Sequence, residues 1–259
     1  MKETVLITGA SSGIGLELAK CFAADGCRLV LVARNTEALE ELAKELRRAH
    51  DVEAIVLTAD LSLPETPKRI FADLSARKIT VDVLVNNAGF GANGAFAEVS
   101  LPRQLEMLQV NIASLTELTG LFLPGMIERK RGGILNVGSV AGFMPGPGMA
   151  VYFATKAFVL SFTEALAEEL IGTGLNVSVL CPGATESNFS NVARGTKSRQ
   201  LKTPKMTSEA VAILGHRTFR KGRVTAVTGI SNKLFVFMTR IFPRQFPRKI
   251  AGVFNRTND

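Results

Sequence analysis

The stretch Thr8-Gly9-Ala10-Ser11-Ser12-Gly13-Ile14-Gly15 stands between an apolar run, Thr4–Thr8, and a helix-forming segment that begins at Leu16. Glycine permits a tight turn and lets backbone N–H groups approach a pyrophosphate at the N-terminus of the next helix. Three glycines alone are a weak signal, but their place between a first strand and a first helix makes it strong. The stretch predicts a dinucleotide site, with an ordinary strand–helix turn as the alternative. The expected contacts are Gly9, Ser11, Ser12, Gly13, Ile14 and Gly15.

The rest of the chain repeats this alternation of short apolar runs with longer helical segments. Several runs are apolar on both faces, which is typical of strands buried in a parallel sheet. Helical segments such as Glu37–Ala49 and Phe153–Thr173 separate most of them. The alternation predicts an α/β fold, a doubly wound Rossmann sheet in a single domain over residues 1–259. The predicted strands are Thr4–Thr8, Arg28–Ala33, Glu53–Thr58, Asp82–Asn86, Gly133–Gly138, Asn176–Leu180 and Arg223–Val227.

Composition excludes several classes of protein. The chain has 259 residues, of which 46% are hydrophobic and 21% charged, so it is not a disordered chain. No apolar run approaches the roughly 18 residues that a spanning helix needs, and strand-like sequence from Glu3 leaves no room for a signal peptide. Three cysteines, Cys21, Cys27 and Cys181, lack metal-ligand spacing. We therefore expect a cytoplasmic protein with reduced thiols and no metal site.

Charge is distributed unevenly along the chain. The net charge is +8, yet residues 190–259 carry 15 Lys or Arg and only two acids, Glu209 and Asp259. Such asymmetry indicates an anionic partner. Residues 231–259 mix apolar with basic residues, which suits either a subunit interface or an interfacial helix at an anionic membrane surface. No nucleic-acid-binding motif is present, so we expect no nucleic-acid partner.

The end of the second predicted strand bears on cofactor choice. The run is Leu31-Val32-Ala33-Arg34-Asn35, with no acid before Glu37. An NAD enzyme usually places Asp or Glu there to hold the ribose 2′-hydroxyl. The planar guanidinium of Arg34 pairs well with phosphate oxygens, which favours NADP(H) over NAD(H). The alternative is a solvated surface arginine.

A second polar cluster predicts catalytic chemistry. Tyr152, the single tyrosine of the chain, and Lys156 are four residues apart and so share one face of a helix. Ser139 ends a predicted strand, where catalytic groups lie in open α/β sheets. A tyrosine beside an ammonium and a positive nicotinamide ring has a lowered pKa, which tunes it as a general acid or base. Ser139 then hydrogen-bonds the substrate oxygen where charge develops.

With these residues the chain resembles the short-chain dehydrogenase/reductases, in the branch whose members have about this length. Within this family, the chain resembles a bacterial group of general-purpose NADP-dependent reductases. The resemblance implies a mostly parallel seven-stranded sheet, hydride transfer between the nicotinamide and a carbonyl or secondary alcohol, and a homo-dimer or tetramer. The motifs that carry it lie between Thr4 and Ser187: Thr8-Gly9-x3-Gly13-x-Gly15, Asn86-Asn87-Ala88-Gly89, Asn111, Ser139, Tyr152, Lys156 and Pro182-Gly183.

The same resemblance implies individual roles. Asn111 holds a bent helix and a water that links Lys156 to solvent, and Lys156 also binds the nicotinamide ribose. The family often has Thr at the position of Ser187, and Ser187 keeps the hydroxyl group of that threonine without its methyl group. The other implied cofactor contacts are Asp60 and Leu61 at the adenine, Asn87, Ala88 and Gly89 at the adenosine ribose, Tyr152, and Pro182, Gly183 and Thr185 along the nicotinamide.

The substrate side is expected in three segments, Phe90–Phe96, Val140–Met149 and Ser187–Met206, with a lid near residues 187–210. Their apolar side chains favour a hydrophobic ketone or acyl substrate, although core packing explains any one of them. Intact Ser139, Tyr152 and Lys156 favour a reductase over an idle NADP-binding sensor or a membrane-peripheral scaffold. The apolar side chains are Phe90, Phe96, Phe143, Met144, Met149 and Phe189.

Overall fold

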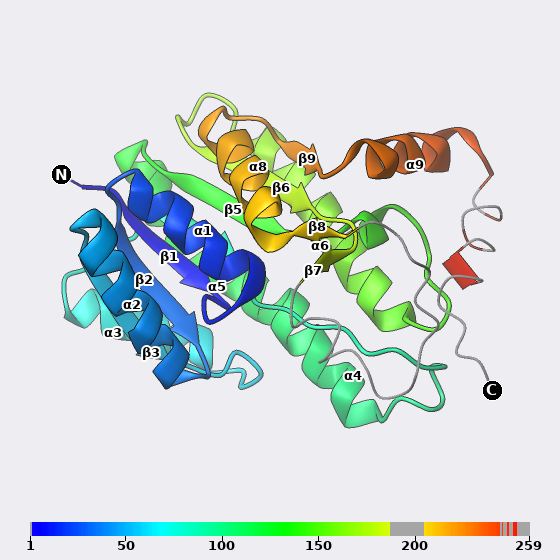
Figure 1. Ribbon diagram of the computed structural model, residues 1–259, viewed down its shortest axis with the longest axis horizontal. Helices are drawn as coiled ribbons and strands as arrows, with labels where there is room; N and C mark the ends of the chain where they lie inside the picture. The colour runs from blue at the N-terminus through cyan, green and yellow to red at the C-terminus, as the bar shows by residue number, and fades with distance from the viewer. Residues whose placement is uncertain (1, 187–204, 244, 246–247, 249–250, 253–259) are drawn as a thin grey trace.

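Among the residues that the computed structural model describes (2–186, 205–243, 245, 248, 251 and 252), seven strands form one sheet with the order β3-β2-β1-β4-β5-β6-β9 (Figure 1). Every neighbouring pair is parallel. The chain order reverses between β1 and β4, and ligands of such sheets bind where the order reverses, at the carboxyl ends of the strands. The strands are β1 (Thr4–Thr8), β2 (Arg28–Ala33), β3 (Ala54–Thr58), β4 (Val83–Asn86), β5 (Gly133–Val137), β6 (Asn176–Cys181) and β9 (Thr225–Val227).

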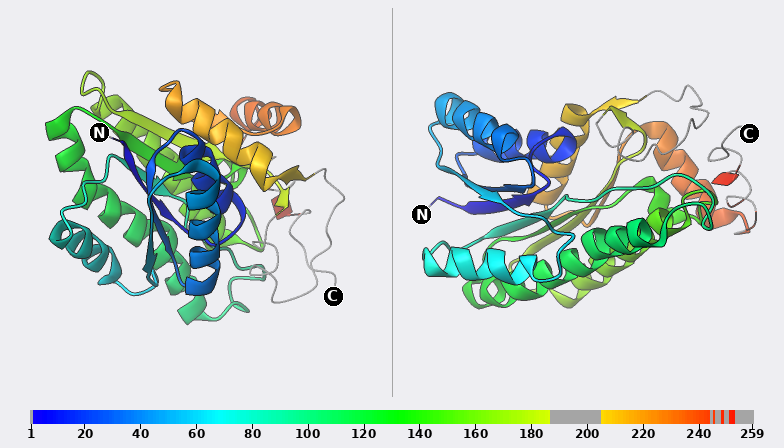
Figure 2. Two further views of the ribbon diagram at one scale, coloured as in Figure 1. Left: turned by 60° about the vertical axis from the view of Figure 1, so that its left-hand side comes forward. Right: turned by 90° about the horizontal axis from the view of Figure 1, so that it is seen from below.

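Helices cover both faces of the sheet, which confirms the doubly wound prediction (Figure 2). One face carries α1 (Gly13–Ala24), α2 (Thr36–His50) and α8 (Ser208–Arg220). The other face carries α3 (Thr66–Ala76), α5 (Leu115–Arg129) and α6 (Ala150–Glu169). The remaining elements are α4 (Leu101–Leu108), the π-helical turn η1 (Gln109–Ser114), the 3-10 turn η2 (Val140–Phe143), the short strands β7 (Thr185–Glu186) and β8 (Met206–Thr207), and α9 (Ile230–Ile241).

Strand β1 shows why runs that are apolar on both faces build this sheet. Its side chains alternate, so that Val5 and Ile7 join the cluster under α1 and α2 while Leu6 joins the cluster under α3 and α5. All three are fully buried. A strand with water on one side would alternate apolar with polar residues, and β1 does not.

The structure leaves the predicted lid untested and bears on the predicted absence of spanning helices. Residues 187–204 of the lid lie outside the described part of the chain, and Ser208 already begins α8. Two helical stretches, Leu101–Arg129 and Ala150–Glu169, are long and apolar enough by composition to cross a membrane, contrary to the sequence expectation. Both contribute to the core, for example through Phe122 and Leu166, and 39% of each apolar window is buried.

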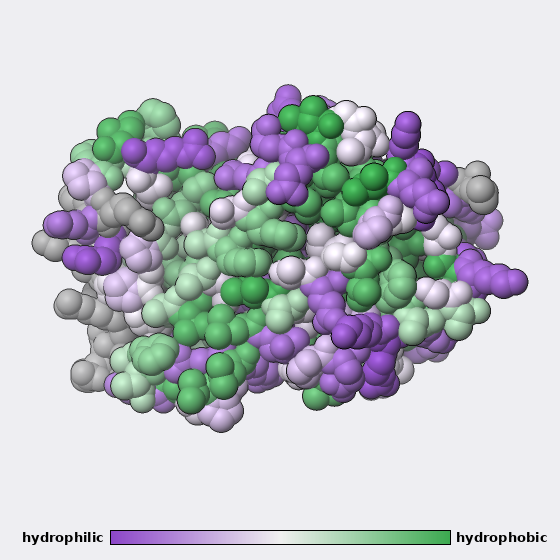
Figure 3. Space-filling model, turned by 180° about the vertical axis from the view of Figure 1, so that it is seen from behind, coloured by the Kyte–Doolittle hydropathy of each residue, from purple (hydrophilic) through white to green (hydrophobic). Residues whose placement is uncertain are grey.

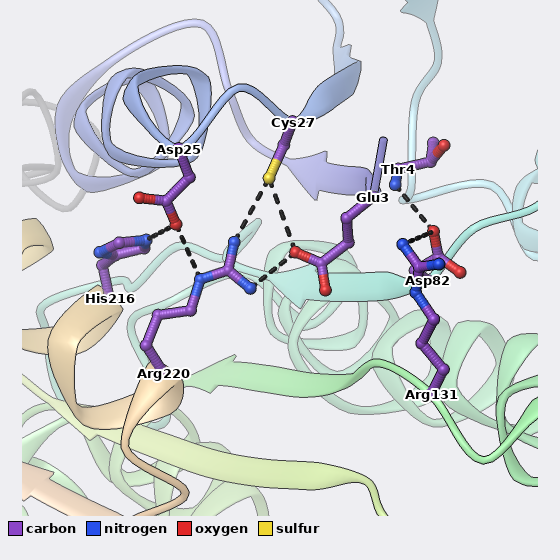
Figure 4. A network of polar contacts seen from close by, with 8 residues as sticks. All are labelled: Glu3, Thr4, Asp25, Cys27, Asp82, Arg131, His216 and Arg220. Carbon is purple, nitrogen blue, oxygen red and sulfur yellow. Dashed lines mark hydrogen bonds and ion pairs between the residues drawn. The ribbon is translucent and has the colours of Figure 1, made fainter. Parts of the chain in front are cut away.

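A polar network ties the basic C-terminal third of the chain to β1 and α1 (Figure 4). The guanidinium of Arg220, at the end of α8, donates to Glu3 (2.6 Å), to Asp25 (2.8 Å) and to the sulfur of Cys27 (3.3 Å). His216 shares the Asp25 carboxylate at 2.9 Å and meets the ring of Phe22 edge to face. The sequence does not reveal this contact, because Asp25 and His216 are distant along the chain and only folding brings them together.

We expect Arg220→Ala to lower the free energy of unfolding by about 2 kcal/mol, because Glu3 and Asp25 lose a charged hydrogen-bond partner while part-buried. Arg217, exposed on the same helix, supplies the matched control Arg217→Ala, with an expected change near zero. Urea unfolding of the two variants measures the difference. Equal midpoints for both variants would contradict the structural role of this network.

Candidate active site

The glycine turn joins β1 to α1 at the carboxyl edge of the sheet, as the sequence predicts. Gly9 has φ +66° and Gly13 has φ +57°, a left-handed region that favours glycine. A Cβ on Gly15 would lie 2.3 Å from Asn87 Nδ2 and 2.4 Å from the Gly9 carbonyl oxygen, so only glycine fits there. Ser12 precedes α1 without a side-chain cap, and the first turn holds no acid. The free N–H groups of that turn therefore fit the pyrophosphate of a dinucleotide.

The side chain of Thr8 fastens the turn to β4, a role that the sequence analysis missed. Its hydroxyl donates to the Val85 carbonyl and accepts from the N–H groups of Asn87 and Ala88, both at 3.0 Å. The Asn87 amide in turn donates to the carbonyl oxygens of Thr8 and Gly9. The predicted ribose residues Asn87 and Ala88 thus lie directly beside the glycine turn. The threonine before Gly9 was the available signal.

Arg34 follows β2 and lies at the adenosine end of the site. Its side chain is 66% exposed, and its nearest acid is Glu106 of α4 at 4.0 Å. Burial opposes ionisation of Asp60, but hydrogen bonds from Ser62 and the charge of Arg34 hold the pKa of that carboxyl below its usual value. Leu61, next to Asp60, is buried. The structure therefore brings Arg34, Asp60 and Leu61 together at one end of the cleft, with a free guanidinium face.

Ser139, Tyr152 and Lys156 meet at the carboxyl end of β5. Ser139 caps η2, where its hydroxyl oxygen accepts from the Ala141 N–H at 3.1 Å. Tyr152 and Lys156 stand one turn apart on α6, with the Lys156 ammonium 5.9 Å from the centre of the tyrosine ring. Lys156 Nζ donates to the Val137 carbonyl at 2.8 Å, which fixes the long side chain. The three side chains therefore converge as the sequence predicts.

The electrostatics of this group differ from the sequence expectation for Tyr152. Burial raises the pKa of Tyr152 to about 12, and a hydrogen bond with the side chain of Ser139 opposes this only in part. Burial also lowers the pKa of Lys156 to about 8. The lowered tyrosine pKa expected from the sequence depends on a bound nicotinamide ring as well as on the ammonium, whereas in the chain alone desolvation of the phenolate dominates. Tyr152 is therefore a firmly protonated donor.

Asn111 lies in the π-helical turn between α4 and α5. Its amide donates to the Phe90 carbonyl and to Thr155 Oγ1, both at 3.0 Å, and its oxygen accepts from the Phe90 N–H. Thr155 donates to the Tyr152 carbonyl at 2.7 Å. A Cβ on Gly89 would lie 3.0 Å from Asn111 Oδ1 and 3.5 Å from Lys156 Nζ, so Gly89 keeps the two groups close. Thr155 is a positioning residue that the sequence analysis missed.

The predicted nicotinamide residues follow β6. Pro182 and Gly183 come directly after it, and Thr185 in β7 donates from its hydroxyl to the Gly183 carbonyl at 3.0 Å. A Cβ on Gly183 would lie 2.1 Å from Asn232 Nδ2, so α9 packs directly on this turn. Ser187 and Phe189 lie outside the described residues. The contact with Asn232 was invisible in the sequence because it joins segments about fifty residues apart.

A pocket opens beside Tyr152, between the segment after β4 and the start of α6. Of the predicted substrate wall, Phe96 and Met149 line it, whereas Phe90 and Met144 are buried and Phe143 packs against the core. The residues that line it are Ala92, Gly94, Phe96, Val99, Gln104, Met107, Met149, Ala150 and Val151. Two of the three predicted segments thus contribute to this pocket, and most of the third, Ser187–Met206, lies outside the described residues.

Gln104 contributes the one strongly polar side chain among those lining residues. It is 5% exposed, and its Nε2 donates to the carbonyl oxygens of Phe96 and Val99 at 2.9 and 2.8 Å. These two bonds fix the orientation of the amide, because Oε1 could not replace Nε2 as donor. Oε1 has no hydrogen-bond partner among the described residues. The pocket is apolar with one buried acceptor.

No group of three or more His, Cys, Asp or Glu able to hold a metal ion occurs among the residues that the structure describes. Within the same part of the chain the three cysteines are free.

Comparison with known proteins gives the class. A sequence model of the family described as "short chain dehydrogenase" matches residues 3–198. A ketoacyl reductase from Nostoc sp. is 33% identical over 95% of this chain and 87% of its own. The short-chain dehydrogenase of Sphingobium yanoikuyae in complex with NADPH superposes with a TM-score of 0.83 at 33% identity, covering 92% and 93% of the chains. A short-chain dehydrogenase/reductase of Burkholderia phymatum in complex with NAD gives 0.82 at 26% identity over 100% and 97%.

A parallel Rossmann sheet with a glycine turn and a Ser–Tyr–Lys cluster at its carboxyl edge defines a nucleotide-binding oxidoreductase. The chain belongs to the short-chain dehydrogenase/reductase family. Family members bind a nicotinamide cofactor and act on small carbonyl compounds, and the resemblance inferred from the sequence is confirmed.

Proposed function

We propose that this protein is an NADPH-dependent carbonyl reductase of hydrophobic ketones or acyl-type substrates. The observation that carries the proposal is the convergence of Ser139, Tyr152 and Lys156 beside a glycine turn and an apolar pocket. The ketoacyl reductase of Nostoc sp., similar over nearly the whole chain, supports the substrate class. An idle nucleotide sensor is disfavoured because all three side chains are present and oriented by hydrogen bonds.

The preference for NADPH rests on Arg34. Its guanidinium lies at the end of β2, largely exposed, and its closest acid is at 4.0 Å, so it is free to pair with a 2′-phosphate. No acid stands where an NAD enzyme would hold the ribose 2′-hydroxyl. The NADPH-bound structure of the Sphingobium relative supports the same choice.

We expect Arg34→Ala to weaken NADPH binding by about tenfold and to leave NADH binding unchanged, because one charge-assisted phosphate contact is lost. Thermal shift with each nucleotide measures this, since a ligand stabilises the fold by RT ln(1 + [L]/Kd). Arg48→Ala, at an exposed arginine of α2, is the control. Equal loss of NADPH and NADH affinity would contradict the assignment of Arg34 to the 2′-phosphate.

The proposed reaction uses the residues in fixed roles. The glycine turn and Lys156 would hold a nicotinamide nucleotide, which would supply the hydride for the carbonyl carbon. Ser139 hydrogen-bonds the carbonyl oxygen where negative charge develops. Tyr152 donates its phenolic proton to that oxygen, which gives a secondary alcohol. Lys156 stabilises the phenolate left behind, and Asn111 lies beside it on the path by which the tyrosine regains a proton.

The pocket supports an apolar substrate with one donor. Phe96, Met107 and Met149 offer apolar contact, while Gln104 Oε1 is buried without a partner and accepts a hydroxyl or N–H hydrogen. A panel of ketones tests the function: aliphatic and acyl ketones in matched pairs, with and without one donor group remote from the carbonyl. NADPH oxidation that depends on such a ketone supports the proposal. A protein that binds NADPH but reduces no carbonyl in the panel would be the sensor instead.

We also propose a homo-oligomer, as family members are typically oligomeric. Seen from behind, hydrophobic residues spread over the face formed by α4, α5 and α6 (Figure 3). Partly exposed side chains there include Leu105 (53%), Ile127 (39%) and Phe158 (37%). An exposed apolar area of this kind marks an association surface. Light scattering on the purified chain gives the subunit count, and a monomer at working concentration would contradict it.

A further inference from the structure

Helix α9 carries an outward apolar ridge that no described residue covers. Ile230, Leu234, Phe237 and Ile241 follow one another at spacings of four, three and four, so they share one face. Their side chains are 86%, 61%, 58% and 60% exposed. Large apolar residues scattered singly on a surface need no explanation, but four in one row mark a contact surface.

The opposite side of α9 holds the helix against the body of the protein. Val236 is buried there, and Asn232 Nδ2 donates to the Thr228 carbonyl at 2.7 Å. The same Asn232 side chain lies against Gly183, on the turn after β6. The ridge is therefore presented by a docked helix, which Figure 1 shows at the edge of the molecule.

Charge indicates what covers the ridge. Lys233 and Arg240 are exposed at one margin of it, and Arg248 beyond the helix is exposed as well. The sequence from residue 210 to residue 258 contains no Asp or Glu. Two copies paired symmetrically through α9 would gather like charges without any acid in this stretch to offset them. An anionic lipid surface offers both an apolar layer and negative headgroups.

We propose that α9, through this ridge and its basic margin, seats the protein on an anionic lipid surface. The position of α9 connects this membrane binding to the active site, and this part of the inference rests on the proposed function. Helix α9 packs against η2, directly after Ser139, and its Asn232 touches the turn that carries Gly183. A bilayer under the ridge would therefore lie close to η2 and the Gly183 turn, and an apolar ketone dissolved in the bilayer would be concentrated near the proposed active site.

Co-sedimentation of the full chain with lipid vesicles tests the proposed membrane binding. The vesicles are pure phosphatidylcholine or phosphatidylcholine mixed with phosphatidylglycerol. We expect binding to the mixed vesicles that weakens with salt. Leu234→Ser with Phe237→Ser should reduce the lipid affinity about tenfold or more, because two side chains leave the apolar layer. Lys233→Gln with Arg240→Gln should reduce it about tenfold on anionic vesicles only.

Matched controls separate the ridge from general surface effects. Leu63→Ser with Ile171→Ser removes two exposed apolar residues elsewhere, and Arg217→Gln with Lys221→Gln removes two exposed charges on and after α8. Both controls should sediment like the wild type. Failure of the wild-type chain to sediment overturns the proposal, and so does a ridge variant that binds unchanged or that only converts an oligomer to a smaller species. NADPH thermal shift and reduction of a water-soluble ketone, run without lipid, report the proposed function separately.

Discussion

Tyr152→Phe should reduce carbonyl turnover about a thousandfold, since a positioned general acid contributes between 10² and 10⁴ in rate. The phenolic hydroxyl is the one proton donor on α6 that faces Ser139, and burial keeps it protonated by raising its pKa to about 12. Phenylalanine keeps the ring and its packing with Met107 and Phe90, so the fold should not change. Steady-state kinetics with NADPH and a reducible ketone measure the loss in kcat.

Two control measurements separate loss of the Tyr152 hydroxyl from other effects of the substitution. The NADPH thermal shift of Tyr152→Phe should equal that of the wild type, because the lost atom acts on the substrate oxygen. Phe153→Leu changes the neighbouring aromatic ring, 6.1 Å from the Tyr152 ring, without touching the hydroxyl, and should cost far less. A Tyr152→Phe enzyme that keeps a large share of its kcat would show that water or another side chain supplies the proton.

The second large effect is a pH dependence set by Lys156. Burial lowers its pKa to about 8, so the ammonium is present below that pH and is lost as the pH rises through it. In the proposed reaction, the charged form holds the nicotinamide ribose and stabilises the phenolate. We expect kcat/KM for NADPH, which reports groups of the free enzyme, to fall above pH about 8 by tenfold per pH unit.

Lys156→Met is the informative variant, because methionine fills similar space without a charge. Its kcat/KM should drop about a hundredfold at neutral pH and should no longer show the basic limb. Lys156→Arg keeps the charge throughout and should shift the limb to higher pH. If the limb near pH 8 survives in Lys156→Met, another group causes it, and Cys181, whose thiol pKa burial raises to about 12, is too basic to be that group.

Much of the candidate site could be predicted from local sequence, because the placement of its residues depends on backbone geometry. The turn after β1 requires glycine at Gly9 and Gly15, so these glycines can be recognised directly in the sequence. The spacing of Tyr152 and Lys156 is one helical turn, so their shared face follows from the helix itself. The position of Arg34 follows from the end of β2.

Other features needed contacts between distant segments. Gln104 is an unremarkable helix residue in sequence, yet folding buries it in the lining of an apolar pocket and leaves its Oε1 without a hydrogen-bond partner among the described residues. The sequence does not show that His216 pairs with Asp25, because the two residues are 191 positions apart along the chain. The raised pKa of Tyr152 in the chain alone follows from burial, a property of the whole packed core that the sequence does not show.

The sequence by itself determined the α/β class, the nucleotide turn and the catalytic trio, because each depends on periodicity or on spacing within one or two adjacent elements. Only the tertiary structure decided which apolar residues line the pocket and which fill the core, how Thr8 and Thr155 hold the site, and that α9 stands beside Gly183 with its apolar ridge outward. The physical reason is that burial and electrostatics depend on every segment packed around a group. A periodic pattern reports only the face of its own element.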